Sequence, residues 1–394
     1  MTDADPMHQR GRELFSLDPA VAYLNHGAFG AVPIPVQRAQ QRLRDEVDAN
    51  PMAFYHRGLP ARLAETRAWV AGLLGSDPEG TALVANATAG TQTVLGSLGL
   101  VAGDEVLLTD HGYGAVRMQV RRLAETTGIV ASEVPVPLDA GDEEIVASIV
   151  DAVRPDRTRL VIVDHVTSPT ARLFPVARIV AALRERGVAV LVDGAHAPGM
   201  LALDISALGA DFWLGNLHKW AFAARPTAAL VVAPQHRARM QPLVVSWWQD
   251  DGFPGAVEFA GTLDYTAWLA APTALDLLTD LDINAVRRHN ADLAAYGQRT
   301  VADALDLDPA CLPTPSPEPS TVSMRLIPLP PGLADDPSDA SALAQRIATE
   351  LRCEVPVYVW QGRGMLRLSA QIYNRPDDYE RLADGLRALR TQVA

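Results

Sequence analysis

The stretch VAVLVDGAHAPGM (188–200), followed by DFWLGNLHKW (211–220), decides the fold of this chain. Each stretch contains a short apolar run that is typical of a buried strand. The first run ends at Asp193, and the second leads to Lys219. Chemically active side chains that follow strands in this way are typical of parallel sheets, in which ligands bind outside the carboxyl ends of the strands.

The same alternation of strands and helices extends over residues 80–235. RLVIVDHV (159–166) is a near-continuous apolar run, as expected for a strand covered on both faces, and VARIVAALRERG (176–187) is an amphipathic helix. Further strands are expected at residues 81–86, 105–110, 129–136, 188–195, 211–215 and 227–233, with helices from about Ala89 and over 114–125. This order predicts an α/β fold with a mostly parallel sheet flanked by helices.

The C-terminal part has a different pattern. LPTPSPEPSTVS (312–323) carries four prolines and is predicted to be a linker or an edge loop. Beyond it, strands are expected in VSMRLIPL, VPVYVW and MLRLSAQIY, and helices over 339–352 and 376–391. A small C-terminal α+β domain is therefore expected to follow the larger one.

The composition excludes several classes of protein. The 394 residues carry 47 acidic against 34 basic side chains, whereas a nucleic-acid-binding protein usually has a basic face. No apolar run reaches the ~20 residues of a membrane-spanning helix, and the polar, acidic N-terminus is no signal peptide. Cys311 and Cys353 are too few for a disulfide framework or a four-thiolate metal site. We therefore expect a cytoplasmic enzyme without a metal centre.

Lysine is unusually rare, because the chain has 33 arginines and one lysine, Lys219. Arginine carries charge as well as lysine does, but it cannot lose its proton and attack a carbonyl. A lysine retained in so arginine-rich a chain suggests amine chemistry, namely a Schiff base. The alternative is a surface lysine that survived by chance.

Three features cluster at the ends of predicted strands. Asp193 supplies an acid, Lys219 an amine, and residues 86–90 a small-residue loop that opens a helix and suits a phosphate. Pyridoxal phosphate needs all three, since the amine forms the Schiff base, the acid pairs with the pyridine nitrogen and the loop holds the phosphate. The sequence therefore predicts pyridoxal 5'-phosphate as the cofactor.

At these residues the chain resembles a known family. VDGAHAPGM and LGNLHKW look like the fold-type I, class V aminotransferase family of pyridoxal-phosphate enzymes. YLNHGAFGAVP (23–33) narrows the resemblance to the isopenicillin N epimerase-like and cysteine desulfurase-like group, which DHVTSPTARLFPV (164–176), FAGTLDYTAW (259–268) and LRLSAQIYN (366–374) also match. The resemblance implies an N-terminal segment (1–30) that joins the small domain, a large cofactor-binding domain (31–280) and a small C-terminal domain (281–394).

The resemblance also implies roles for single residues. Lys219 would form the Schiff base and then move the Cα proton, Asp193 would bind the pyridine nitrogen, and His196 would bind the phenolic oxygen. The other cofactor positions would be Ser168 as a second candidate for the phenolic oxygen, His111 or Tyr113 stacking on the ring, and Thr88, Ala89, Asn216 and His218 at the phosphate.

For the substrate, the resemblance implies that Arg367 grips the α-carboxylate bidentately. Asn25 and His26 would border the substrate pocket, with a helix-capping or turn role as the alternative. Tyr55 would reach the substrate across a dimer, and Thr262 matches a threonine that the neighbouring subunit contributes to the cofactor site. A homodimer with shared active sites is therefore expected.

The sequence departs from the family pattern in two places. After Lys219 the family has a glycine-rich stretch with a lysine, where this chain reads AFAARPTAAL and Arg225 keeps a charge. Cys353 lies fourteen residues before Arg367, near the place of the nucleophilic cysteine of desulfurases. However, LRCEVPVYVW predicts a helix end entering a strand, and hence a buried structural thiol.

The cofactor leaves the outcome of the reaction open. The resemblance implies an enzyme that forms an external aldimine with an amino acid or amino-acid conjugate and breaks a bond at Cα, in specialised metabolism such as antibiotic biosynthesis. Epimerisation and C–S β-lysis are the leading outcomes, followed by desulfuration, transamination and decarboxylation. Two rival hypotheses are a non-catalytic member of the family and a Rossmann-type nucleotide enzyme, which would need a G-x-G-x-x-G turn that the chain lacks.

Overall fold

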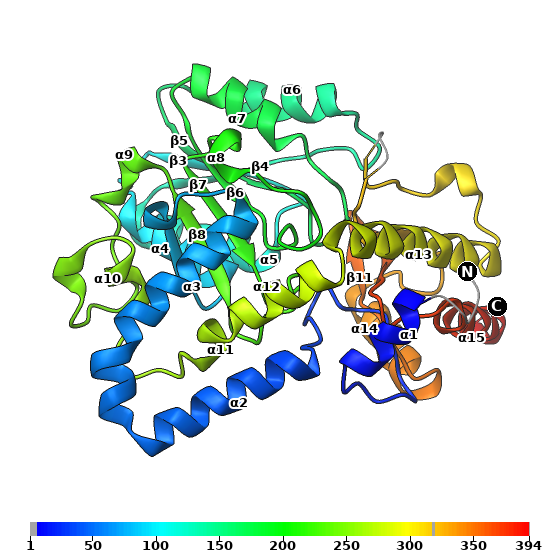
Figure 1. Cartoon of the computed structure of the whole chain (residues 1–394). Coiled ribbons are helices and arrows are strands. Elements are labelled where there is room, and N and C mark those ends of the chain that lie inside the picture. The colour runs from blue at the N-terminus through cyan, green and yellow to red at the C-terminus, as the bar shows by residue number, and fades with distance from the viewer. Residues whose placement is uncertain (1–5, 317–319, 394) are drawn as a thin grey trace. The chain divides into compact units, whose positions relative to one another are not determined.

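The computed structural model describes residues 6–316 and 320–393, and the backbone forms two compact units (Figure 1). The large unit comprises Pro35–Ser168 and Phe174–Thr279. The small unit comprises Met1–Ile34, Pro169–Leu173 and Asp280–Ala394. None of the described helices is long and apolar enough to cross a membrane.

The large unit is built on a seven-stranded sheet with the strand order β2-β8-β7-β6-β5-β3-β4. The strands are β2 (Thr81–Val84), β3 (Glu105–Thr109), β4 (Val130–Val134), β5 (Thr158–Asp164), β6 (Ala189–Asp193), β7 (Phe212–Asn216) and β8 (Ala228–Val232). β8 runs antiparallel to both of its neighbours, and the other neighbouring pairs are parallel. The predicted α/β fold with a mostly parallel sheet is confirmed.

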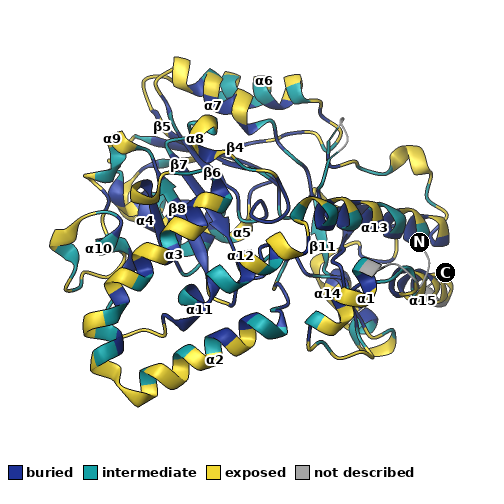
Figure 2. Ribbon diagram, in the orientation of Figure 1, coloured by how far each residue is buried: buried dark blue, intermediate teal, exposed yellow. Residues whose placement is uncertain are grey.

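Helices cover the strands of this sheet, which Figure 2 shows largely in dark blue. The helical elements are α2 (Ile34–Ala49), η1 (Met52–Gly58), α3 (Leu59–Leu74), η2 (Pro78–Gly80), α4 (Ala87–Ser97), α5 (Gly114–Thr127), α6 (Asp142–Ala152), α7 (Val176–Glu185), α8 (Ile205–Leu208), α9 (Pro234–Arg237), η3 (Gln249–Asp251), α10 (Gly255–Glu258), α11 (Thr266–Leu269) and α12 (Ala271–Asp280). α4 packs against β7 and β8, and α7 packs against β6. Leu191, Leu214 and Leu230 consequently have no exposed surface.

The small unit contains two sheets. β11 (Val357–Trp360), β12 (Arg363–Ser369) and β9 (Met324–Pro328) form an antiparallel sheet in that order, and β1 (Ala22–Tyr23) pairs in parallel with β10 (Cys353–Glu354). Its helical elements are α1 (Pro6–Leu14), α13 (Ile283–Ala304), η4 (Pro309–Cys311), α14 (Pro337–Glu350) and α15 (Pro376–Val393). The β1–β10 pairing joins the N-terminal segment to the C-terminal part of the chain.

Some elements differ from the sequence-based expectation. The strand expected in MLRLSAQIY ends at Ser369, because the next residues turn: the Asn374 amide donates to the Gln371 carbonyl and the Gln371 amide to Asn374 Oδ1. The 22-residue helix α13 was not predicted. Of the proline-rich segment, residues 312–316 and 320–323 form no helix or strand.

Candidate cofactor site

The carboxyl ends of the parallel strands lie along one edge of the large unit's sheet. β6 ends at Asp193, β7 ends at Asn216, and Lys219 follows three residues later. β2 runs antiparallel to β8, which runs antiparallel to β7, so β2 ends at the same edge. The Ala87 amide that follows β2 accordingly donates to Asn216 Oδ1 at 2.9 Å. The structure therefore brings the predicted acid, amine and helix N-terminus to one edge.

Lys219 contacts His196 directly. The Lys219 Nζ atom lies 3.2 Å from His196 Nε2, and the Trp220 indole N–H donates to His196 Nδ1 at 3.3 Å. His196 is 1% exposed and Trp220 is 2% exposed. The imidazole is therefore fixed at both of its nitrogens, one of them facing the amine.

Asp193 has a second carboxyl group beside it. Asp164, the last residue of β5, is the register partner of Asp193 in β6, so the two side chains lie on the same face of neighbouring strands. Both are buried. Burial and the charge of Asp193 raise the pKa of Asp164 well above its usual value, against smaller opposing effects of Lys219 and of the Ser168 amide. Burial raises the pKa of Asp193 as well, and the Ala195 amide, which donates to Asp193 Oδ1, opposes that rise.

The N-terminus of α4 is capped by two asparagines. Asn86 Oδ1 accepts from the Ala89 amide at 2.8 Å, and Asn216 Oδ1 accepts from the Ala87 amide. Thr88 lies between these two capped positions, and its amide and hydroxyl are the groups that we expect to meet a phosphate at the positive end of the helix.

His218 is held by the next strand. Its Nδ1 lies 2.8 Å from the Thr227 carbonyl oxygen, and burial lowers the pKa of its imidazole to about 4. His218 is therefore uncharged at neutral pH and adds no positive charge to a phosphate.

The two candidates for stacking on the cofactor differ in exposure. His111 is fully buried, with its Nε2 atom 2.9 Å from the Val136 carbonyl oxygen and its ring centroid 5.4 Å from that of Phe174. Tyr113 is 45% exposed and lies immediately before α5. The stacking role stays a prediction for His111, with Tyr113 as the alternative.

Two residues expected at a subunit boundary lie close together in the large unit. The Tyr55 hydroxyl donates to the Leu263 carbonyl at 2.9 Å, and Thr262, the preceding residue, is exposed. Tyr55 lies in η1, a π-helix, which is a form often found at functional sites. The structure therefore links Tyr55 to the segment that carries Thr262.

In the small unit, Arg367 and Asn25 contact each other. Arg367 is 6% exposed, and its Nη2 donates to Asn25 Oδ1 at 3.4 Å. His26 is completely buried: its Nδ1 lies 2.9 Å from the Tyr373 hydroxyl, and its amide donates to Ser369 Oγ. Asn25 is thus an orienting partner of Arg367, whereas His26 braces the interior of the unit.

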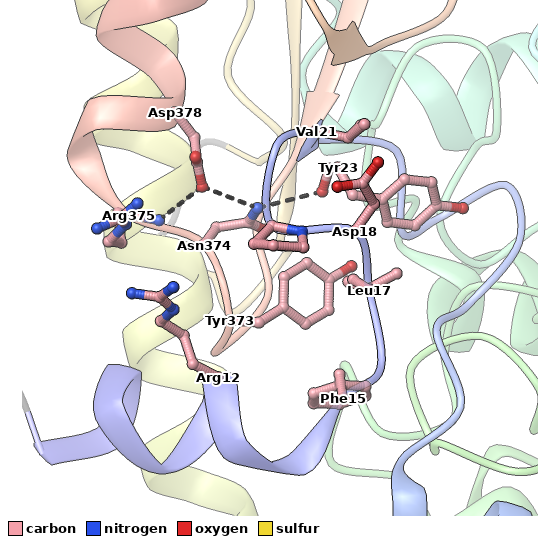
Figure 3. A pocket seen from close by; sticks show the side chains of 11 residues that line it. Arg12, Phe15, Leu17, Asp18, Val21, Tyr23, Tyr373, Asn374, Arg375 and Asp378 are labelled. Carbon is pink, nitrogen blue, oxygen red and sulfur yellow. Dashed lines mark hydrogen bonds between the residues drawn. The ribbon is translucent and has the colours of Figure 1, made fainter.

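Tyr373 also lines a cavity of about 160 Å³ in the small unit (Figure 3). Asn374 crosses one side of it, donating to the Tyr23 carbonyl at 3.1 Å and to Asp378 Oδ2 at 3.4 Å. None of the residues predicted for the cofactor or the substrate is among those that line it. We therefore assign this cavity no part in the candidate site.

Sequence reasoning missed Asp164 and Trp220. Asp164 ends an apolar run beside the strand that ends at Asp193, and parallel pairing of these two strands would have placed the carboxyls together. Trp220 follows Lys219 directly, but nothing in the sequence indicates that its indole reaches His196.

Comparison with known proteins identifies the family of this chain. A sequence model of the aminotransferase class-V family matches residues 22–382. Isopenicillin N epimerase of Streptomyces clavuligerus is 35% identical, with 99% of each chain covered. The putative L-cysteine desulfhydrase 1 of Oryza sativa subsp. japonica is 31% identical, with 94% of this chain and 84% of the relative covered.

Two solved structures share the fold. The cystine C-S lyase C-DES, in complex with its reaction product cysteine persulfide, matches with a TM-score of 0.79 at 23% identity, covering 93% of this chain and 97% of that one. The cysteine desulfurase CsdA from Escherichia coli matches with a TM-score of 0.78 at 22% identity, covering 98% and 99%. At these identities the likeness shows the fold alone, and it confirms the fold type predicted from the sequence.

Proposed function

The chain belongs to the aminotransferase class-V family and is a pyridoxal-phosphate-dependent enzyme, and from this premise we propose that it breaks the Cα–H bond of an amino acid or amino-acid conjugate. The relative named isopenicillin N epimerase supports epimerisation as the outcome. The observation that carries the proposal is the placement of Lys219 Nζ 3.2 Å from His196, at the sheet edge where buried Asp193 ends its strand.

The side chains at this edge fit the cofactor. An amine, a buried carboxylate and a capped helix N-terminus correspond to its aldehyde, its pyridine nitrogen and its phosphate. Once bound, the cofactor supplies an electron sink for the bond that breaks at Cα. Lys219 would hold it covalently, Asp193 would pair with the pyridine nitrogen, and Thr88 would bind the phosphate. After release by the substrate amine, Lys219 Nζ would accept the Cα proton, and inversion would follow when a proton is added to the opposite face of Cα.

Arg367 is the group that we propose for the substrate carboxylate. A guanidinium matches a carboxylate with two parallel hydrogen bonds, and Asn25 Oδ1 restrains one end of this guanidinium. Because the side chain is nearly buried, an Arg367→Lys variant would lose the bidentate contact although it keeps the charge.

A homodimer is proposed from the surface of the large unit. Val245 is 75% exposed and Trp247 is 93% exposed, and Leu243, Val244 and Leu263 are also exposed. Four of these five residues lie within residues 243–247, and exposed apolar side chains concentrated in one segment mark an interaction site, for which a second copy of this chain is the proposed occupant. Thr262 adjoins Leu263, so the same contact would present Thr262 to the partner.

C–S β-lysis of a cysteine conjugate is the second candidate, because relatives named L-cysteine desulfhydrase align over 94% of this chain. A persulfide-forming desulfurase is less well supported by this chain's own residues. Cys353 pairs with β1 as part of β10 and is completely buried, and burial raises the pKa of its thiol to about 11. Such a thiol is not a nucleophile at neutral pH.

The test uses the purified enzyme and its Lys219→Ala variant, which has no lysine. We expect the wild type, but not the variant, to show the visible absorption band of lysine-bound pyridoxal phosphate. Isopenicillin N and L-cysteine are then supplied in D₂O. Deuterium at Cα together with the inverted configuration and no fragmentation supports epimerisation, whereas sulfide and pyruvate support the lyase. A wild type without the band would refute the proposal.

A further inference from the structure

The indole of Trp220 and the amine of Lys219 lie at opposite nitrogens of one imidazole. Trp220 Nε1 is 3.3 Å from His196 Nδ1, and Lys219 Nζ is 3.2 Å from His196 Nε2. An indole N–H only donates, whereas each imidazole nitrogen donates or accepts according to the tautomer. Which nitrogen carries the proton is therefore decided by the indole.

One arrangement of protons satisfies both of these contacts. Because the indole donates to Nδ1, that nitrogen carries a lone pair, so the proton of the neutral imidazole resides on Nε2. The Nε2–H then points at Lys219 Nζ, which accepts through its own lone pair. The opposite tautomer would set an indole N–H against an imidazole N–H, and a protonated imidazole would do the same.

Resting on the proposed function, we propose that Trp220 is a positioning residue that holds His196 as the Nε2–H tautomer, so that His196 donates a hydrogen bond at the position of Lys219 Nζ. The amine is thereby presented with its lone pair, the form that attacks a carbonyl. In the loaded enzyme His196 would present the same N–H to the cofactor's phenolic oxygen.

Because of the charges around Lys219, the tautomer of His196 affects the protonation state of the amine. Asp193, at the end of β6, interacts with Lys219 in the direction that favours the ammonium form, while His218, after β7, is uncharged. A His196 that accepted at Nε2 would add to the same effect. The hydrogen bond from the Trp220 indole prevents His196 from accepting at Nε2.

Close packing of the backbone holds Trp220 against the loop that contains His196. Gly199, with φ of +83°, lies so close to Trp220 that a Cβ there would be 2.2 Å from the Trp220 carbonyl oxygen. The turn that contains His196 is closed by the Ala197 amide donating to the Gly194 carbonyl at 2.8 Å. The loop that contains His196 and the loop that contains Trp220 are therefore packed closely against each other through their backbones.

The experiment determines the tautomer of His196 in the enzyme without cofactor. The full chain is labelled with ¹⁵N-histidine, and two-bond ¹⁵N–¹H spectra are recorded, with His196→Gln assigning the signal. We expect the wild type to show an unprotonated Nδ1 and a protonated Nε2. In Trp220→Phe we expect signal from the Nδ1–H tautomer. We also expect its affinity for pyridoxal phosphate to be about fivefold weaker, because one hydrogen bond is lost.

Trp213→Phe is the matched control. Trp213 is also buried, and its Nε1 has no hydrogen-bond partner among the described residues, so this variant loses an indole but no contact with a histidine. It should keep the wild-type tautomer. A protonated Nδ1 in the wild type would overturn the proposal, as would an unchanged tautomer in Trp220→Phe. The wild-type spectrum alone can refute the proposal, so the test remains decisive even if the Trp220→Phe variant does not fold. A missing lysine-bound band would instead refute the proposed function.

Discussion

Asp164 and Asp193 are two buried carboxyls at matching positions of neighbouring strands. Burial raises the pKa of both carboxyls, and the Asp193 charge adds to the rise at Asp164, so we expect Asp164 to be the carboxyl that keeps its proton more readily. Asp164→Asn is neutral and similar in shape, and it can still accept from the Ser168 amide. We therefore expect its affinity for pyridoxal phosphate to stay within about threefold of the wild type.

Asp193→Asn is the comparison for this prediction. It removes the charged partner of the pyridine nitrogen, so the affinity should fall by more than about tenfold. Titration of the apo enzymes with pyridoxal phosphate, followed by absorbance, measures both. Equal losses in the two variants would show that Asp164 is ionised and acts together with Asp193.

The loops after β6 and β7 meet at Gly199. Its φ of +83° is a conformation that favours glycine, and an added Cβ would collide with the Trp220 backbone. Gly199→Ala should therefore lower the free energy of unfolding by about 2–4 kcal/mol, from the backbone strain and the overlap together. Urea denaturation measures the loss.

Gly72→Ala is the control for this substitution. Gly72 lies within α3, and a Cβ there would have no atom within 4 Å. The free energy of unfolding should rise by roughly 0.5–1 kcal/mol, because alanine is the better helix former. If Gly199→Ala were as stable as Gly72→Ala, the loops of His196 and Lys219 would not depend on that close approach.

The elements of the sheet were predictable where the chain has short apolar runs between helices. RLVIVDHV became β5, and TALVAN became β2 followed by a helix capped at Asn86. The strand order was not predictable, because no local pattern says that β8 inserts between β2 and β7. That insertion is what brings Ala87 to Asn216.

The same limit applies to the candidate site. Lys219 and Asp193 are recognisable from their own motifs, since each follows an apolar strand. The hydrogen bond of Trp220 to His196 joins residues 24 positions apart and depends on how two turns pack. Such a partner becomes visible only when the turns are placed in three dimensions.

At the scale of the whole molecule, Thr262 tests whether sites are shared between subunits. The residue is exposed and adjoins the apolar surface proposed for the dimer. If Thr262 contributes to the partner's site, a mixed dimer of a Lys219→Ala subunit and a Thr262→Ala subunit has one complete site. In that site, the Thr262→Ala subunit supplies Lys219 and the Lys219→Ala subunit supplies Thr262.

Co-expression of these two variants should therefore restore activity. Random pairing makes half of the dimers mixed, each with one complete site of two, so about a quarter of the wild-type activity is expected. The assay is run at a cofactor concentration that leaves Thr262→Ala largely empty. Lys219→Ala with Asp193→Asn is the control, because both residues lie at the same sheet edge of one subunit and no complete site can form. The first pair of variants could also stay inactive while light scattering showed a dimer. In that case Thr262 would not contribute to the active site of the neighbouring subunit. The exposed apolar surface would then form the dimer contact without completing the partner's active site.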